Sequence, residues 1–478
     1  MTALPQILMA ASEALSSHAG DPVAVEALLQ AVFGIVVDEA IQKGTSASEK
    51  VCEWKEPEEL KKLLDLELRS QGESQEQILD RCRAVIRYSV KTGHPRFFNQ
   101  LFSGLDPHAL AGRIITESLN TSQYTYEIAP VFVLMEEEVL RKLRVLVGWS
   151  SGDGIFCPGG SISNMYAVNL ARYQRYPDCK QRGLRTLPPL ALFTSKECHY
   201  SIQKGAAFLG LGTDSVRVVK ADDRGRMVPE DLERQISMAE AERPWDISGI
   251  EDMEQEQLPS FAWTVSTPPV AFLVHGYLLG AGAAIHLSLP DVKGTFGSGA
   301  VPFLVSATSG TTVLGAFDPL EAIADVCQRH GLWLHVDGSG KGGGALGGEL
   351  EEEPLTCLCS TPSRADSVAW NPHKLLAAGL QCSALLLQDT STWKKASVER
   401  VGSDILLTLT QNLLKRCHGS QASYLFQQDK FYDVELDTGD KVVQCGRRVD
   451  CLKLWLMWKA QGSQGLERRI DQAFALAR

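Results

Sequence analysis

The sequence of 478 residues predicts an α/β fold in which a mostly parallel sheet carries helices on both faces. Two observations support this fold class. Short apolar runs alternate with segments whose apolar residues recur at helical spacing, which is the pattern of repeated strand–helix–strand units. Residues with chemically useful side chains directly follow several apolar runs, and ligands of such sheets bind beyond the carboxyl ends of the strands. The length suffices for two or three domains.

The first 90 residues are expected to be helical. Apolar residues recur at helical spacing in Val25–Phe33 and in Glu58–Leu68, and Pro57 among acidic residues is typical of a helix start. Val131–Val147 has the pattern of a strongly amphipathic helix, with its apolar residues on or near one side.

From residue 190 onward, strands and helices are predicted to alternate. One helix opens at Pro229 with acidic residues in its first turn, and another, Leu320–His330, stops at Gly331. The predicted strands are Ala191–Ser195, Ser215–Val219, Pro302–Ala307, Leu332–Asp337 and Ala365–Trp370.

The composition excludes several classes of function. A net charge of −11 argues against a nucleic-acid partner and against binding to anionic membranes. The N-terminus lacks the basic region of a secretory signal, and the apolar run Val270–Leu289 contains glycines and histidines, so no membrane span is expected. The 12 cysteines are scattered through apolar contexts such as that of Cys445, which favours a reduced, cytoplasmic protein. Cys357 and Cys359 lack further ligands at metal spacing, so no metal site is expected.

A glycine pair marks a candidate phosphate site. Gly159 and Gly160 precede Ser161 and Ser163, ahead of a helix predicted over Met165–Tyr173. Two glycines let backbone N–H groups approach an anion closely, the serine hydroxyls add donors, and the helix dipole favours a phosphate. A plain helix N-cap explains the same residues equally well. The spacing is not that of the dinucleotide fingerprint, so a nicotinamide cofactor is disfavoured.

The stretch Ser367–Lys374 organises the rest of the site. A β-rich run ends at Asn371 and Pro372, which break regular structure and place His373 and Lys374 on a turn before an apolar segment. A lysine beside an apolar wall is a candidate for a lowered amine pKa, which an amine needs to attack an aldehyde and form an imine. From this stretch alone, a surface lysine on a turn is the commoner explanation.

Residues elsewhere in the sequence indicate that Lys374 belongs to a candidate cofactor site. His199, Thr308 and Asp337 each follow or end a predicted strand, as Lys374 does, so a parallel sheet gathers them at one edge. With the glycine–serine segment they make the set that pyridoxal phosphate requires. The lysine holds the aldehyde, a carboxylate keeps the pyridine nitrogen protonated so that the ring can accept electrons, and an imidazole stacks on the ring or transfers protons.

Long motifs then point to a family. They are His94-Pro-Arg-Phe-Phe-Asn-Gln-Leu, Tyr126-Glu-Ile-Ala-Pro-Val-Phe, Gly159-Gly-Ser-Ile-Ser-Asn, His335-Val-Asp, Ala369-Trp-Asn-Pro-His-Lys and Tyr424-Leu-Phe-Gln-Gln-Asp-Lys-Phe-Tyr. In these motifs the sequence resembles the group II pyridoxal-phosphate amino-acid decarboxylases, the branch that includes glutamate decarboxylase. The resemblance implies an aspartate-aminotransferase-like (type I) fold, a pyridoxal 5′-phosphate cofactor, a homodimer and α-decarboxylation of a small acidic amino acid.

The resemblance also implies roles for single residues. Lys374 forms the internal aldimine, Asp337 pairs with the ring nitrogen and His199 stacks on the ring. Tyr432 or His199 returns a proton to Cα, and Ser420 helps to hold the phosphate bound to the partner subunit. The whole cofactor-binding set is Gly160, Ser161, His199, Thr308, Asp337, His373, Lys374 and Ser420.

The same resemblance places the substrate pocket at Gln100, Leu101 and Phe102. Phe102 stands where the glutamate enzymes have a smaller polar residue. This favours a shorter acidic substrate, cysteine sulfinate first, with cysteate or aspartate as further substrates.

Three stretches depart from the family pattern, at about residues 243–300, 338–363 and 392–411, and the first is expected to be poorly ordered or packed on the outside of the fold. The predicted division is a helical, dimer-associated segment over 1–110, a large cofactor-binding domain over 111–440 that holds these inserts, and the start of a C-terminal region over 441–478. The family pattern continues beyond Arg478 into a domain with a substrate-binding arginine. Two functions therefore stay open: an active decarboxylase, or an impaired relative that binds the cofactor or heterodimerises with full-length subunits.

Overall fold

The computed structural model describes residues 21–99, 101–102, 104–242, 299–338, 362–389, 412–420 and 422–477. Most of the three predicted inserts, including the apolar run Val270–Leu289, lies outside these residues, as does Gln100. The predicted domain boundaries stay a prediction.

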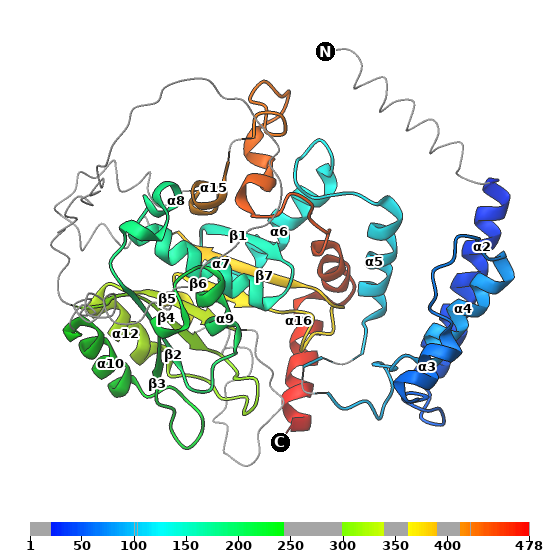
Figure 1. Ribbon diagram of the computed structural model, residues 1–478, viewed down its shortest axis with the longest axis horizontal. Helices are drawn as coiled ribbons and strands as arrows, with labels where there is room; N and C mark the ends of the chain where they lie inside the picture. The colour runs from blue at the N-terminus through cyan, green and yellow to red at the C-terminus, as the bar shows by residue number, and fades with distance from the viewer. Residues whose placement is uncertain are drawn as a thin grey trace, which may run out of the picture.

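A seven-stranded sheet forms the centre of the molecule, with the strand order β1-β7-β6-β5-β4-β2-β3 (Figure 1). Strands β2 to β6 pair in parallel, and β7 is antiparallel to both of its neighbours. The predicted fold class is therefore confirmed. The strands are β1 (Gly152–Cys157), β2 (Leu190–Ser195), β3 (Val216–Val219), β4 (Val301–Thr308), β5 (Trp333–Asp337), β6 (Ser367–Trp370) and β7 (Ser383–Gln388).

Helices cover both faces of the sheet. On one face, α7 (Gly160–Arg175), α9 (Ser201–Phe208) and α15 (Leu413–His418) pack on strand side chains such as Leu192. The next residue along that strand, Phe193, points to the other core. This alternation of side chains makes two separate hydrophobic cores, one on each face of the sheet, as expected of a parallel sheet that helices cover on both faces. The second core lies under α6 (Pro130–Val147), α10 (Pro229–Ala241), α12 (Leu320–His330) and α16 (Cys451–Ala477).

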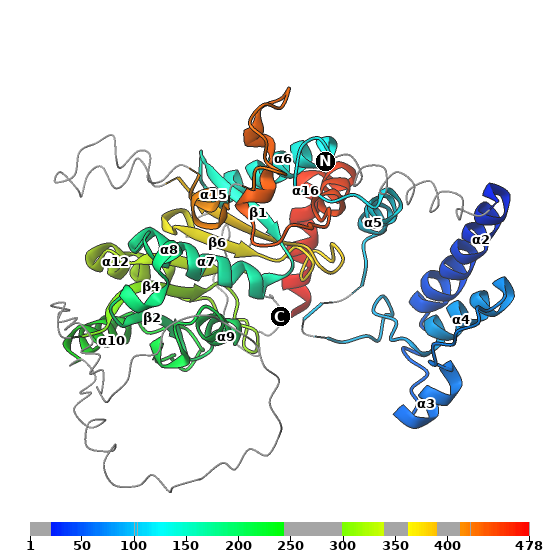
Figure 2. The ribbon, with the colours of Figure 1, turned by 45° about the horizontal axis from the view of Figure 1, so that its top comes forward.

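Three N-terminal helices stand away from the body of the molecule (Figures 1 and 2). They are α2 (Pro22–Ile35), α3 (Pro57–Leu64) and α4 (Gln75–Tyr88), with a π-helical turn at Val36–Gln42. We call residues 22–88 the N-terminal arm. Helix α5 (Pro107–Leu119) follows and packs against α16. The remaining short elements are α8 (Cys179–Arg182) and 3-10 turns at Lys43–Thr45, Leu184–Thr186, Thr213–Ser215, Pro362–Arg364, Val434–Leu436 and Thr438–Lys441.

Several predicted boundaries were wrong. Helix α3 ends at Leu64 instead of Leu68, because Asp65 turns left-handed with φ of 45°. Helix α7 begins at Gly160 instead of Met165, so the glycine–serine segment is its first turn. Strands β1 and β7 were not predicted. Cys445, expected in a buried setting, is exposed.

No helix in the described part of the chain is both long enough and apolar enough to cross a membrane.

Candidate active site

Four of the predicted site residues meet at the carboxyl edge of the sheet. Thr308 and Asp337 are the last residues of β4 and β5, and they pair directly in the sheet register. His199 follows β2, and Lys374 follows β6. The charge of Asp337 acts on the pKa values of both His199 and Lys374, which shows how closely the topology gathers these side chains.

Lys374 sits on a tight turn with an apolar floor. Its backbone N–H donates to the carbonyl of Asn371 (3.0 Å), and Leu376 beside it is fully buried. Burial lowers the pKa of the Lys374 amine, and the charge of Asp337 opposes that shift only in part. A lowered pKa raises the fraction of neutral amine at neutral pH, and the neutral amine is the nucleophile.

Asp337 is held by a buried network that sequence reasoning missed. The side-chain amide of Asn164 donates from Nδ2 to Asp337 Oδ2 (2.9 Å) and to Ser201 Oγ (2.9 Å). Its Oδ1 lies 3.0 Å from Nε2 of His335, whose Nδ1 lies 2.9 Å from Ser367 Oγ. Burial lowers the pKa of His335 to about 4, so its ring is neutral and donates from Nε2 to Asn164. The amide orientation that results favours the ionised form of Asp337.

His199 is linked to the same network through Ser201. The backbone N–H of Ser201 donates to His199 Nδ1 (3.2 Å), and the Ser201 hydroxyl lies 2.8 Å from that nitrogen. Burial lowers the pKa of His199, Asp337 opposes this shift and the nearby Lys374 charge adds to it. The imidazole is therefore neutral at physiological pH, half-buried, and fixed in its tautomer with the proton on Nε2.

The first turn of α7 makes a cradle for an anion. Gly159 has φ of 100°, which glycine adopts without strain, and no side chain caps this helix. A Cβ at Gly160 would lie 2.4 Å from Asn371 Nδ2, and one at Gly159 would lie 3.6 Å from Gln381 Nε2. Two side-chain amides thus face the glycine pair and the uncapped helix end. In the described part of the chain, Asn371 Oδ1 is buried without a hydrogen-bond partner.

These features fit pyridoxal phosphate. The cradle offers backbone N–H groups, Ser161 and two side-chain amides to a phosphate, and the Asn371 amide comes this close only because residue 160 has no Cβ. A buried carboxylate and a lysine of lowered pKa stand across from it at the strand ends. Together they are the hydrogen-bonding and charged groups that a phosphorylated pyridine aldehyde requires of its binding site.

Two further residues of the predicted cofactor-binding set, His373 and Thr308, make hydrogen bonds that hold the backbone around the site. The His373 ring is buried, and its Nδ1 lies 2.5 Å from the Cys382 carbonyl oxygen and 3.1 Å from the Cys382 backbone nitrogen, which ties the lysine turn to the start of β7. Thr308 donates its backbone N–H to Asp318 Oδ2 (2.7 Å). Burial raises the pKa of Asp318 to about 6, although the amides of Met227 and Thr308 favour its charged form.

The remaining predicted site residues lie elsewhere. Leu101 is exposed, and Phe102 packs on Phe97 with ring centroids 6.0 Å apart, in the segment between the N-terminal arm and α5. Tyr432 donates to Asp437 Oδ1 (2.9 Å), and Ser420 donates its backbone N–H to Asp440 (3.0 Å). Within the described ranges, no hydrogen bond or ring contact of these residues reaches Lys374, His199 or Asp337.

Signals for the missed residues exist in the sequence spacing. Asn164 stands four residues after Gly160, so both share one face of α7. His335 stands two residues before Asp337 and shares its side of β5. Neither spacing alone separates a network residue from an ordinary polar one.

Known proteins resemble the chain over most of its length. The family model described as the pyridoxal-dependent decarboxylase conserved domain matches residues 57–244 and 291–478. The chain is 76% identical to human cysteine sulfinic acid decarboxylase over 470 residues, which cover 98% of this chain and 79% of that relative. It is 50% identical to acidic amino acid decarboxylase GADL1 of Xenopus tropicalis over 453 residues, 95% of this chain and 73% of the relative.

A solved structure shows the same fold. The crystal structure of mouse CSAD superposes with a TM-score of 0.74 at 70% identity, covering 96% of this chain and 78% of that chain. The lysine, the aspartate and the glycine pair all lie in the matched ranges. The extent of the family match and the level of identity show that the chain belongs to the pyridoxal-dependent decarboxylases, as its motifs predict.

Proposed function

We propose that this chain removes the α-carboxylate of cysteine sulfinate, with pyridoxal phosphate held at Lys374. The observation that carries the reaction class is the half-buried Lys374 with its lowered pKa beside the network-held Asp337. The choice of substrate rests on the relatedness to human cysteine sulfinic acid decarboxylase.

The site residues divide the work of holding the cofactor. Lys374 would hold the aldehyde carbon, and Asp337 would face the ring nitrogen. His199 would lie over the ring, and the first turn of α7 with Ser161 would bind the phosphate. When bound, the cofactor supplies a conjugated ring that takes up the electron pair left at Cα as CO₂ departs.

Asp337 has to stay ionised for that chemistry, and its surroundings favour this. The Asn164 amide can only donate toward Asp337, because its oxygen accepts from neutral His335. A carboxylate that accepts such a bond in a buried site is stabilised relative to the neutral acid. The network thus keeps a negative charge at the end of β5.

A proton must replace the lost CO₂ at Cα, and two side chains are candidates. His199 lies beside Lys374 and Asp337, and its neutral ring carries the proton on Nε2. Tyr432 donates instead to Asp437 and packs on Tyr126 with ring centroids 5.0 Å apart. We assign the transfer to His199 within one chain, and to Tyr432 only if its segment serves the site of a partner subunit.

We also propose a cytoplasmic homodimer. The N-terminal arm exposes Val23, Leu29 and Val85 at 72%, 50% and 56%, and the body exposes Val131 and Leu134 at 61% and 50%. Apolar surface of this extent is typical of a subunit interface. Every cysteine within the described ranges is unpaired, which favours a reducing compartment. Sedimentation at micromolar concentration should give a dimer, and a monomer would contradict the proposal.

One experiment tests the function. The protein is incubated with pyridoxal phosphate, reduced with borohydride and mapped by mass spectrometry, and CO₂ release is measured on cysteine sulfinate, cysteate, aspartate and glutamate. We expect the label on Lys374 and the fastest release from cysteine sulfinate. Lys374→Arg should abolish both, and Lys220→Arg, at an exposed site, should change neither. Label on another lysine would overturn the site, and a preference for glutamate would overturn the substrate.

A second candidate function is cofactor binding without turnover. The interruption of the family match between residues 244 and 291 favours it. The same experiment separates the two functions, because this candidate predicts label on Lys374 and no CO₂ from any of the four acids.

A further inference from the structure

The segment Leu375–Gln381, which we call the lysine loop, connects Lys374 to β7. It forms no helix or strand, and Ala377 and Gly379 have φ of 55° and 76°. For alanine this left-handed conformation is unfavourable, because its Cβ crowds the following carbonyl oxygen. The loop keeps this shape because other elements hold it.

Neighbouring elements hold the lysine loop through hydrogen bonds to its backbone carbonyls. Four of them accept hydrogen bonds, three from cationic side chains on α5 and α16 and one from the residue that caps α5. The pairs are Arg469 Nη1 to Leu376 O (3.2 Å), Asp106 N to Ala377 O (3.2 Å), Arg113 Nη1 to Leu380 O (3.1 Å) and Lys453 Nζ to Gln381 O.

Arg469 also binds the segment that leads into α5, whereas the second acceptor of Lys453, Asp450, lies only three residues away in the chain. The same Nη1 donates to Asp106 Oδ2 (2.9 Å). The other oxygen of Asp106 accepts from the backbone N–H groups of His108 and Ala109 and so caps α5. Burial favours the neutral acid, but Arg469 and these two amides hold the pKa of Asp106 below its usual range. Asp106 follows the candidate substrate residues Leu101 and Phe102 in the chain.

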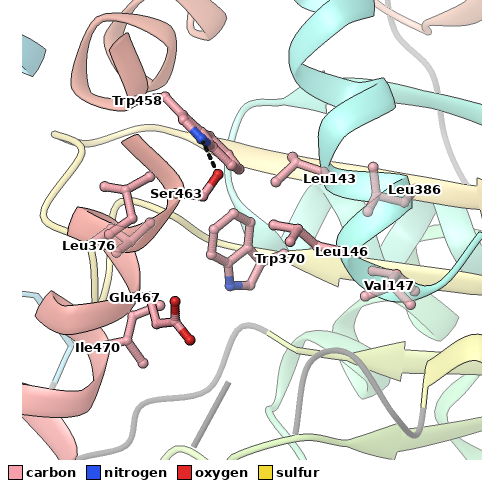
Figure 3. A pocket seen from close by; sticks show the side chains of 12 residues that line it. Leu143, Leu146, Val147, Trp370, Leu376, Leu386, Trp458, Ser463, Glu467 and Ile470 are labelled. Atoms are coloured by element: carbon pink, nitrogen blue, oxygen red, sulfur yellow. Dashed lines mark hydrogen bonds between the residues drawn. The ribbon is translucent and has the colours of Figure 1, made fainter. Parts of the chain in front are cut away.

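The side chain of Leu376 reinforces the connection. It is 1% exposed and lines an apolar cavity together with Leu466 and Ile470 of α16 (Figure 3). Helix α16 therefore contacts the residue two places after Lys374 twice, through its carbonyl and through its side chain.

We propose that Arg469 is a positioning residue, which sets the lysine loop, and with it Lys374, against the segment that carries Leu101 and Phe102. This inference rests on the proposed function, in which Lys374 holds the cofactor, and on the prediction from the sequence that the segment with Leu101 and Phe102 lines the substrate pocket. A displacement of reacting groups by about 1 Å costs roughly 10²-fold in rate. Arg469 touches neither candidate reacting group, so its effect passes through the backbone of the loop.

The test compares Arg469→Gln and Arg469→Lys with Arg468→Gln. Arg468 is the neighbouring residue, exposed on the same helix, and no hydrogen bond or ion pair is assigned to it in the described part of the chain. Two readouts are measured: kcat and KM on cysteine sulfinate, and hydrogen–deuterium exchange of residues 375–382 in protein without cofactor. Arg469→Gln should lower kcat by 10- to 100-fold and speed exchange in this peptide at least 10-fold, with exchange in β6 unchanged.

Arg469→Lys and Arg468→Gln show whether the changes in kcat and in exchange are specific to the guanidinium of Arg469. Arg469→Lys should recover part of both readouts, because an ammonium can reach one of the two acceptors but not the guanidinium geometry. Arg468→Gln should match the unsubstituted protein. Unchanged exchange and kcat in Arg469→Gln would overturn the proposal. So would faster exchange in every core peptide, which marks a merely structural role.

The experiment distinguishes a failure of the positioning role of Arg469 from a failure of the proposed decarboxylase function. If the unsubstituted chain shows no turnover on any acid, the function fails, and the exchange of residues 375–382 still decides whether Arg469 holds the loop. If turnover is present and exchange is unchanged, the positioning role alone fails.

Discussion

Asn164 uses its whole amide in the site. Both hydrogens of Nδ2 are donated, to Asp337 and Ser201, and Oδ1 accepts from His335. With Oδ1 accepting from His335, the amide nitrogen is the atom that faces Asp337. Asp337 therefore meets a donor, which favours its ionised form.

Replacing Asn164 with Asp should test this at the residue scale. The substitution puts a second carboxylate against Asp337 and removes the donor, and a hydrogen bond to a buried charge contributes about 1.5–3 kcal/mol. We expect kcat on cysteine sulfinate to fall by roughly 10- to 150-fold, which is that energy expressed as a rate. Steady-state kinetics check it, and Asn169→Asp on the same helix, away from Asp337, should keep kcat within about threefold. Equal losses in both variants would contradict the role of Asn164.

The sequence indicates Lys374, Asp337 and His199 because each carries its signal locally. Lys374 has the Asn-Pro turn before it, and the other two stand at or after the end of a β-rich run. Asn164 and His335 carry no such signal, since their hydrogen bonds join residues 171 and 173 positions apart. Long-range partners are invisible until the sheet topology is known.

At the scale of elements, the missed strands lack the alternation of apolar and polar residues that marks a strand. Strand β1 contains two glycines, and β7 has four consecutive apolar residues between Ser383 and Gln388. The start of α7 was placed too late because its first turn is polar. Tertiary packing and the cradle at Gly160 decide where these elements begin.

Gly160→Ala should weaken cofactor binding. The new Cβ would come within 2.4 Å of Asn371 Nδ2 and push that side chain, three residues before Lys374, out of place. We expect the Kd for pyridoxal phosphate to rise at least tenfold, measured by titration of the cofactor absorbance. Gly34→Ala is the matched control, because open space surrounds Gly34 within α2. It should raise the free energy of unfolding by about 0.5–1 kcal/mol and leave the Kd unchanged.

The apolar cavity between α6, α16 and β6 should respond to filling. Its volume is about 170 Å³, and Val147 lines it (Figure 3). Val147→Ile adds a methylene group into this space and should raise the free energy of unfolding by about 0.5–2 kcal/mol, measured by urea titration. Val139→Ile places the same group in a packed part of α6, where overpacking costs roughly 1–3 kcal/mol. A loss of stability in both variants would show that the cavity cannot take the group.

At the scale of the whole molecule, buried histidines should make stability depend on pH. Burial lowers the pKa values of His335, His373 and His418 to about 4. Unfolded histidine titrates near pH 6.5, so between about pH 6.5 and 4 the unfolded chain binds more protons than the folded one. Their contribution is fully present above pH 6.5 and is lost as the pH falls.

Two carboxylates work in the opposite direction, because burial raises the pKa of Asp318 to about 6 and also raises the pKa of Asp450. Their contribution to stability is present at low pH and is lost as the pH rises through their folded pKa values. The three histidines outweigh these two carboxylates, at up to roughly 1.4 kcal/mol per pH unit each. The urea midpoint should therefore fall from pH 7.5 to pH 5, and His418→Gln, which removes a ring packed on Tyr166, should flatten that slope. Equal midpoints at both pH values would contradict the prediction.

The strand order has a consequence for synthesis on the ribosome. Strand β1, the first to be made, pairs with β7, the last, so that Cys157 waits for Ser383. At about 5–20 residues per second, the intervening chain takes on the order of 10–50 s to emerge. During that time the β1 edge stays unpaired, and Asp337 and Lys374 have not yet met. The nascent chain must be shielded from aggregation while it waits, and cofactor capture belongs to the finished chain.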